Sequence, residues 1–284
     1  MQALKKIPQA AFSTAVWSTS FVWMGAVAAT WGITGIFVPP RRTHNYIGGP
    51  GMAAVLKFTL SDVDVHYHPR FDPERRSIFV QNHVNLLDAH IACKSIPHAF
   101  CGLMNAWQFK IPIYGWIMKL ADGIAVPKGD GRFRVVADAA KDRAAKGISI
   151  LTFPEAHRTL DGKVREFKKG VFLIAKMAGL PVVPLAVYGM RDLMQKGSLL
   201  VKPAKIKVLV GPQFETEGLK SHELNALIAK VHRIVSDFAE RGEMPTDELI
   251  DAPLTKELTA RLEADLAERR AAEAAEAEAE SAAE

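Results

Sequence analysis

Residues 77–91 read SIFVQNHVNLLDAHI, and this stretch decides the fold. Its first four residues form an apolar run that predicts a buried β-strand. Polar residues follow, among them His83, and Asp88 comes five positions later. Five steps along an α-helix turn a side chain by roughly 140°, so the two would not meet on one helix. They can touch only if His83 lies in a turn after the strand and Asp88 in the first turns of a following helix.

This arrangement would place an imidazole and a carboxylate in the kind of turn where α/β folds hold reactive groups. A carboxylate beside a histidine fixes the tautomer of the ring and stabilises the cation that forms when the ring takes up a proton. The spacing alone also fits a structural histidine near an acidic residue at a helix start. His83 and Asp88 are therefore candidates for a general base and the group that orients it.

Apolar runs and helical patterns alternate on both sides of this stretch. Buried strands are predicted at residues 77–80, 124–126, 149–153, 182–187 and 206–210. Val63 and Val65 alternate with polar residues, which predicts a strand with one exposed face. Helices are predicted at residues 107–120, 132–146, 169–178 and 223–240. This alternation predicts an α/β layered domain, with a largely parallel or mixed sheet flanked by helices.

A second polar group follows another predicted buried strand. It reads PEAHR and ends at Arg158, and FKKG follows at residues 167–170. A carboxylate and a guanidinium three residues apart could bind a hydroxyl and a phosphate together, because arginine forms bidentate phosphate contacts. Lys168 and its neighbour add positive charge at a predicted helix start, where backbone amides also favour anions. A surface ion pair between Glu155 and Arg158 is the other interpretation.

Together these stretches resemble the glycerophospholipid acyltransferase family, whose best-known members are 1-acylglycerol-3-phosphate acyltransferases. That family carries four ordered blocks: N-H-x4-D, G-x-I-F-V-x-R, F-P-E-G-T-R and an apolar V-x-P block. Residues 82–88 match the first block in full, and residues 181–184 match the fourth. The resemblance covers about residues 77–188, and it lies in four blocks that occur in the expected order.

Two blocks depart from the family pattern. In the second block, Asp122, Ala125 and Lys128 stand where the family has Gly, Phe and Arg. In the third block, Ala156 and His157 replace Gly and Thr. Lysine keeps the charge of arginine but loses its planar fork, so we expect phosphate recognition to differ. The changes in the third block affect the expected acceptor more than the expected reaction.

The resemblance implies transfer of a fatty acyl group from acyl-CoA or acyl carrier protein to the free hydroxyl of a lysophospholipid. The expected acceptor is 1-acylglycerol-3-phosphate, giving phosphatidic acid. The alternative is another lysolipid, such as a lyso-amino-acid lipid or lysophosphatidylethanolamine. The resemblance also implies that His83, held by Asp88, removes the proton of the acceptor hydroxyl. Neither a cofactor nor a metal is expected.

The resemblance also implies which residues bind the substrates. Glu155 and Arg158 are assigned to the glycerol and phosphate of the acceptor, and Lys128 to a second phosphate contact. Lys168 is expected to add positive charge beside them. Pro184 and its apolar neighbours would help to shape the donor or acyl site.

Charge is divided unevenly along the chain. The net charge is +5, with 36 Lys and Arg against 31 Asp and Glu. Residues 255–284 carry a net charge of −5, so the preceding residues carry +10. A basic body of this kind favours phosphate or an anionic membrane surface as partner. No zinc-finger spacing or RRM-like aromatic motif accompanies the charge, so nucleic acid is not expected.

The N-terminal segment is the most apolar part of the sequence. Residues 7–40 hold no charged residue, and residues 11–38 exceed the roughly 20 residues that cross a bilayer as a helix. A spanning or re-entrant transmembrane helix, a pair of interfacial helices and a cleaved signal peptide are the three interpretations. Basic residues on both sides leave the orientation open. We expect a membrane location, with the catalytic domain on the cytoplasmic face.

Three parts follow from these patterns: residues 1–47 as an anchor or interfacial helices, 48–250 as the catalytic domain, and 251–284 as an Ala/Glu-rich tail. A break between the first two parts is predicted at GGPG, residues 48–51. The composition of the tail predicts a solvated helix, because little beyond Leu266 is apolar enough to pack. The two cysteines, Cys93 and Cys101, are expected to be core thiols.

Two rival functions remain at this point. His66 and His68 share a face of a predicted strand and, with His83, Asp88 and His90, supply ligand types for a metal-dependent hydrolase. No known ligand spacing is completed. A non-catalytic membrane-binding protein would use the same basic surface, and it would need neither His83 nor Asp88.

Overall fold

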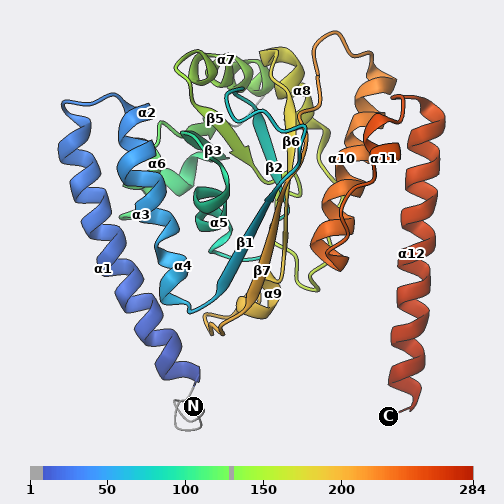
Figure 1. The fold of residues 1–284 in the computed structure, drawn as a ribbon, viewed down its shortest axis with the longest axis horizontal. Coiled ribbons are helices and arrows are strands. Elements are labelled where there is room, and N and C mark those ends of the chain that lie inside the picture. The colour runs from blue at the N-terminus through green and yellow to red at the C-terminus, as the bar shows by residue number, and fades with distance from the viewer. Residues whose placement is uncertain (1–8, 128–130, 284) are drawn as a thin grey trace.

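A sheet with helices on both faces forms the centre of the protein (Figure 1). The computed structural model describes residues 9–127 and 131–283, and within them the sheet has seven strands. These are β1 (Asp62–Tyr67), β2 (Ile78–Gln81), β3 (Phe100–Asn105), β4 (Ile124–Val126), β5 (Ser149–Thr152), β6 (Val182–Tyr188) and β7 (Lys205–Val210). They lie in the order β1-β7-β6-β2-β5-β3-β4, and all neighbours are parallel except β6 and β7. The predicted α/β fold with a largely parallel sheet is confirmed.

The helices divide between the two faces of the sheet. One face is covered by α1 (Gln9–Gly35), α2 (Pro40–Thr43), the π-helix η2 (His44–Gly48), α3 (Gly49–Ala53), α4 (Val55–Phe58), α5 (Asp88–Ser95), the 3-10 helix η3 (Ala106–Lys110), α6 (Tyr114–Leu120) and α9 (Met190–Leu193). The other face is covered by α7 (Arg132–Ala145), α8 (Lys169–Ala178) and α10 (Ser221–Arg241). The chain ends with α11 (Asp247–Asp251) and α12 (Lys256–Ala283), and α12 lies along α10 (Figure 1).

The strands bury both of their faces, as parallel strands between helical layers do. In β2, Phe79 packs into the core beneath α1 and α5, whereas Ile78 and Val80 pack into the core beneath α8 and α10. This explains why β2 reads as a continuous apolar run. β3 was not predicted, because Gly102 interrupts its apolar run and Asn105 ends it, and both residue types are depleted in strands. The helix predicted at residues 107–120 is interrupted at Pro112, which cannot donate a backbone hydrogen bond.

The N-terminal segment forms two helical stretches packed side by side, α1 and the run from α2 to α4 (Figure 1). Residues 48–51, where a break was predicted, are helical and lie at the end of η2 and in α3. Their glycines permit close approach to α1. A Cβ at Gly48 would lie 2.2 Å from the ring of Trp31, and one at Gly51 would lie 2.7 Å from Val27.

None of the helices in residues 9–127 and 131–283 is both long enough and apolar enough to cross a membrane. The structure therefore does not support the predicted transmembrane helix. α1 has the length, with 27 residues, but Ser, Thr and Gly dilute its apolar character. One of its faces, which includes Ser13, Ser20 and Trp31, is buried against the rest of the chain. The predicted boundaries of the three parts stay predictions.

Candidate active site

Two neighbouring strand ends bring the candidate residues together. β2 and β5 are parallel, and Val80 pairs with Thr152. The segments that follow these strands therefore leave the sheet at the same edge. His83 follows the end of β2, and Glu155 follows the end of β5.

The predicted contact between His83 and Asp88 is present. His83 Nδ1 lies 2.7 Å from Asp88 Oδ2, and Asp88 is the first residue of α5. The aspartate side chain is 1% exposed and the histidine side chain 23% exposed. An ionised carboxylate only accepts hydrogen bonds, so in the neutral ring Nδ1 carries the proton and Nε2 keeps its lone pair.

The same carboxylate closes the turn that holds the histidine. Asp88 Oδ2 accepts hydrogen bonds from the backbone amides of Val84 at 2.7 Å and Asn85 at 3.0 Å. The His83 ring also stacks on Phe153, with ring centroids 4.1 Å apart and an interplanar angle of 22°. Ring and backbone are therefore fixed together.

Glu155 holds the backbone of the same turn. Its Oε1 accepts from the amide of His83 at 2.7 Å, and its Oε2 accepts from the amide of Arg165 at 2.8 Å. The residue is 3% exposed. Burial raises the pKa of Glu155 to about 7, although the two amide donors oppose this rise. Each oxygen thus binds one backbone amide, and the assignment of Glu155 to the acceptor stays a prediction.

The remaining predicted residues differ in their burial and in the elements on which they lie. Arg158 is half-buried and precedes Thr159, whose amide donates to the carbonyl oxygen of His83 at 2.9 Å. Lys168 is exposed directly before α8. Pro184 is buried in β6, where it pairs with Val80, so it lies within the sheet. Lys128 lies outside the described residues.

Two asparagines of the turn also have structural roles that the sequence analysis missed. The amide of Asn82 exchanges two hydrogen bonds with the backbone of Val187, at 3.0 and 2.8 Å. Asn85 Nδ2 donates to the carbonyl of Met190 at 2.7 Å. Both asparagines are buried, and they tie the turn to the end of β6 and the start of α9. Two asparagine side chains close to His83 in the sequence could have predicted these contacts, since buried side-chain amides need hydrogen-bond partners.

Backbone geometry explains the glycines that the family blocks contain. Ala156 has a φ of +65° and Asp122 has a φ of +59°, and both stand where the family has Gly. This left-handed region costs an L-residue about 1–2 kcal/mol, and Asp tolerates it better than most residues. Both positions therefore have a backbone conformation that favours glycine, and the residues present adopt it at a cost in stability.

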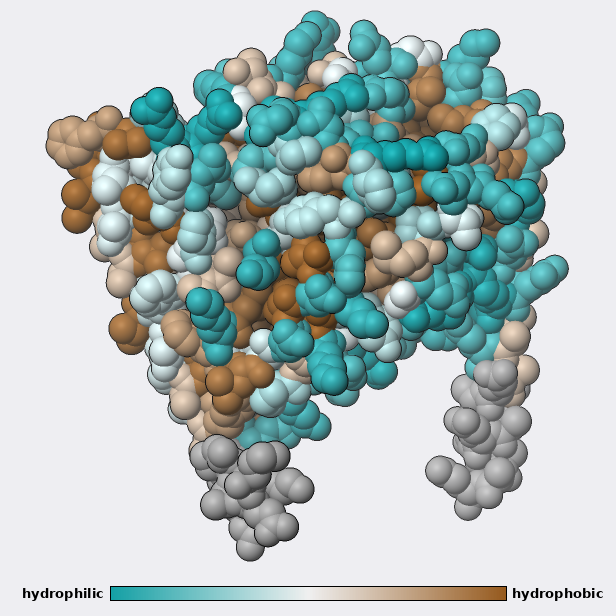
Figure 2. Space-filling model, in the orientation of Figure 1, coloured by the Kyte–Doolittle hydropathy of each residue, from teal (hydrophilic) through white to brown (hydrophobic). Residues whose placement is uncertain are grey.

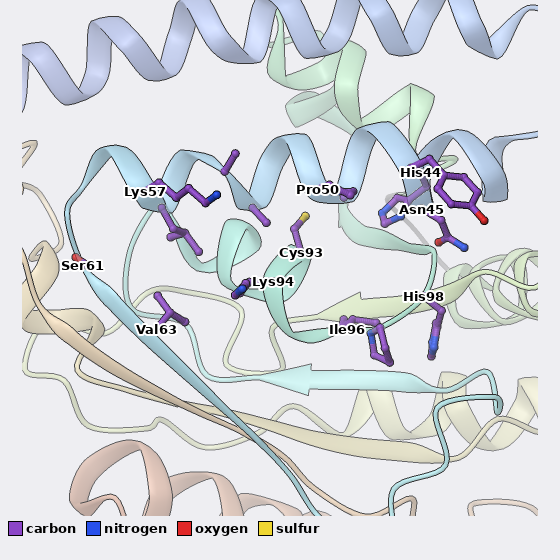
Figure 3. Close-up of a pocket in the computed structure, with 16 residues that line it drawn as sticks. His44, Asn45, Pro50, Lys57, Ser61, Val63, Cys93, Lys94, Ile96 and His98 are labelled. Carbon is purple, nitrogen blue, oxygen red and sulfur yellow. The ribbon is translucent and has the colours of Figure 1, made fainter.

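A pocket of about 730 Å³ lies beside α3, α4 and α5 (Figure 3). It is bounded by the helical stretch from His44 to Lys57 and by the C-terminal end of α5, with Lys94 and His98 in its wall. None of the residues of the His83 cluster described above lines it. This pocket is therefore a different place from the candidate active site.

The histidines proposed for a metal site are not brought together. His66 contacts Asp64, and His90 contacts the carbonyl of Met52. In the described part of the chain, no group of three or more His, Cys, Asp or Glu side chains is placed to hold a metal ion.

Comparisons with known proteins find similar chains. The family model described as Acyltransferase matches residues 62–188. The 1-acyl-sn-glycerol-3-phosphate acyltransferase of Cocos nucifera is 26% identical over 172 residues, which is 60% of this chain and 56% of that protein. The Limnanthes alba protein of the same name is 26% identical over 214 residues, 73% of this chain and 75% of that protein.

A solved structure has the same fold. The crystal structure of the 1-acyl-sn-glycerophosphate acyltransferase PlsC from Thermotoga maritima superposes with a TM-score of 0.72 at 21% identity, covering 87% of this chain and 100% of that chain. The chain is similar to the acyltransferase family that these proteins represent, and the family model covers its residues 62–188. It spans little more than half the length of the Cocos nucifera relative, 56%.

The raised pKa of Glu155 predicts a pH-dependent stability. The value is about 7 in the folded protein, against 4.5 for an ordinary glutamate. The folded state keeps this proton where the unfolded chain releases it, so stability falls as the pH rises from about 4.5 to about 7, by up to about 3 kcal/mol. Glu155→Gln cannot ionise and should lack this fall.

Denaturant unfolding of both proteins between about pH 4.5 and pH 8 measures the difference. Glutamine offers one fewer oxygen to the two amides, so the variant should be less stable overall. The slope of the difference against pH is the informative quantity. Parallel curves for the two proteins would contradict the assignment.

Proposed function

We propose that the protein transfers a fatty acyl group from a thioester to the free hydroxyl of a lysophospholipid. The observation that carries this proposal is the His83 ring, held through Nδ1 by the buried Asp88 carboxylate, with Nε2 left as a proton acceptor. Similarity of residues 62–188 to the acyltransferase family supports the same reaction. A non-catalytic membrane-binding protein would have no use for this contact.

The reaction follows from the free nitrogen. His83 Nε2 takes the proton of the acceptor hydroxyl while the hydroxyl oxygen attacks the thioester carbonyl carbon. The new C–O bond forms, the C–S bond breaks, and the imidazolium returns its proton to the departing thiolate. Asp88 stabilises the imidazolium meanwhile, as an ionised partner on the opposite nitrogen. When the alcohol is oriented beside a base, it can attack the thioester directly, so no covalent acyl-enzyme intermediate is needed.

We favour 1-acylglycerol-3-phosphate as the acceptor, because the relatives named above act on it and cationic residues follow Glu155 in the same loop. Arg158 and Lys168 are the proposed phosphate contacts, and Lys196 lies beside Arg158, donating to its carbonyl oxygen at 2.7 Å. Lys128 stays a proposed second contact. The alternative acceptor is another lysolipid, since Ala156 and His157 change the third block. Acyl-CoA and acyl carrier protein are the two candidate donors.

An acyl-transfer assay tests the reaction and the acceptor together. The purified full chain is offered a panel of lysolipids with each donor type, alongside His83→Ala. The variant should lose at least about a hundredfold in kcat, because general-base catalysis contributes about 10²–10⁴-fold. His66→Ala, which removes an exposed histidine of β1, is the control and should keep its activity. A His83→Ala protein with more than a few per cent of the wild-type rate would rule out the base.

We also propose that α1 lies at a membrane surface, with the catalytic part on the cytoplasmic side. Val22 and Ile33 are 77% and 65% exposed, and their spacing places them about 20° apart around the helix. Ile36 and Phe37 continue this apolar surface at 75% and 81% exposure. Figure 2 shows apolar side chains gathered along this edge of the molecule. The exposed Arg41 and its neighbour would meet anionic head groups.

Sedimentation with vesicles of anionic phospholipid tests this location. Replacing Val22, Ile33, Ile36 and Phe37 together by serine should reduce the bound fraction severalfold, because these side chains would lose their burial in the acyl region. Met244→Ser removes an exposed apolar side chain elsewhere and should bind like the wild type. Equal binding by all three proteins would exclude this surface.

A further inference from the structure

The C-terminal helix α12 continues to contact the body after its apolar residues end. Leu258 and Leu262 are buried, as expected for the start of the tail. Beyond them, the sequence predicts little packing. The structure instead places three charged side chains in ion pairs: Arg269 with Asp237 at 2.8 Å, Arg270 with Glu240 at 2.6 Å, and Glu273 with Lys163.

Arg270 and Glu240 together hold one residue of the loop between β5 and α8. Glu240 Oε1 accepts a hydrogen bond from the amide of Val164 at 2.7 Å. Arg270 Nη2 donates to the carbonyl oxygen of the same Val164 at 3.3 Å. Both backbone groups of Val164 are thus bound by one ion pair between α10 and α12. The pair is largely shielded, with Glu240 12% and Arg270 27% exposed.

The next residue of this loop contacts the candidate active site. The amide of Arg165 donates to Glu155 Oε2, and its carbonyl oxygen accepts from His232 Nε2 of α10 at 3.2 Å. The other oxygen of Glu155 binds the amide of His83. A continuous series of contacts therefore leads from Arg270 through Val164, Arg165 and Glu155 to the backbone of His83.

We propose that Arg270 and Glu240 are positioning residues, through which α12 fixes the loop of residues 159–168 and so the carboxylate of Glu155. The consequence for catalysis rests on the function proposed above. The loop contains no helix or strand, so its shape depends on such contacts. Removal of Arg270 leaves Val164 with one partner fewer and the shielded Glu240 without its cation. The loop then opens more often, and Glu155 loses the amide of Arg165.

The chain offers a matched control one residue away. Arg269 lies on the same helix and forms an ion pair with the same partner helix, at 2.8 Å to Asp237. Within the described residues, no hydrogen bond or ion pair links Arg269 to residues 159–168. Arg269→Ala and Arg270→Ala each remove one ion pair between α12 and α10, although Asp237 keeps Arg233 and Arg241 as partners. Only Arg270→Ala should disturb the loop.

Hydrogen–deuterium exchange of the full chain tests the coupling without any need for activity. The amides of residues 159–168 should exchange about tenfold faster in Arg270→Ala than in the wild type. The exchange rates of the same amides should be unchanged in Arg269→Ala. In Arg270→Lys, which keeps a charged donor, the rates should lie between those of the wild type and those of Arg270→Ala. Equal changes in the two alanine variants, or none in Arg270→Ala, would overturn the proposal.

Steady-state acyl transfer tests the consequence for catalysis. Arg270→Ala should lose about tenfold in kcat/KM for the acceptor, with Arg269→Ala within about twofold of the wild type. An active wild type with unchanged kcat/KM in Arg270→Ala, despite faster exchange, would refute the positioning role. A wild type that transfers no acyl group, with the exchange pattern as expected, would refute the proposed function and leave the coupling between α12 and the loop supported.

Discussion

The contact between the Asp88 carboxylate and the His83 turn is the constraint on which the site depends. One oxygen, Asp88 Oδ2, binds the ring of His83 and the amides of Val84 and Asn85. It therefore fixes the tautomer of the ring and the shape of the turn at once. Because the carboxylate is almost fully buried, these donors replace the hydrogen bonds that Oδ2 would otherwise form with water. The strand, the turn and the start of α5 form one unit around it.

A second set of contacts holds this unit against its neighbours. Glu155 binds the amide of His83 from the β5 side, and Asn82 binds Val187 from the β6 side. Both are buried side chains that bind backbone groups, so the site is built on the two strands adjacent to β2. Such satisfied buried networks fix one geometry, because any shift leaves a polar group unpaired. Arg270 and Glu240 extend the same principle to the loop that Glu155 needs.

Much of this was readable in the sequence, where local patterns carry the information. The apolar run of β2 and the amphipathic pattern of α8 gave those elements almost to the residue, and the spacing of His83 and Asp88 gave their contact. Long-range packing decided what was missed. Gly48 reads as a helix breaker until Trp31 is seen against it. Likewise, the partners of Glu155 are backbone amides, one of them 72 residues away, which no side-chain pattern reports.

The central claim is that Asp88 holds His83 with its proton on Nδ1 and its lone pair on Nε2. The most direct measurement is ¹⁵N NMR of the full chain labelled at histidine, recorded at a pH where the ring is neutral. The His83 signals are identified by their loss in His83→Gln. The structure requires Nδ1 to resonate as a protonated nitrogen and Nε2 as an unprotonated one. A proton on Nε2, or an even mixture of the two tautomers, would contradict it.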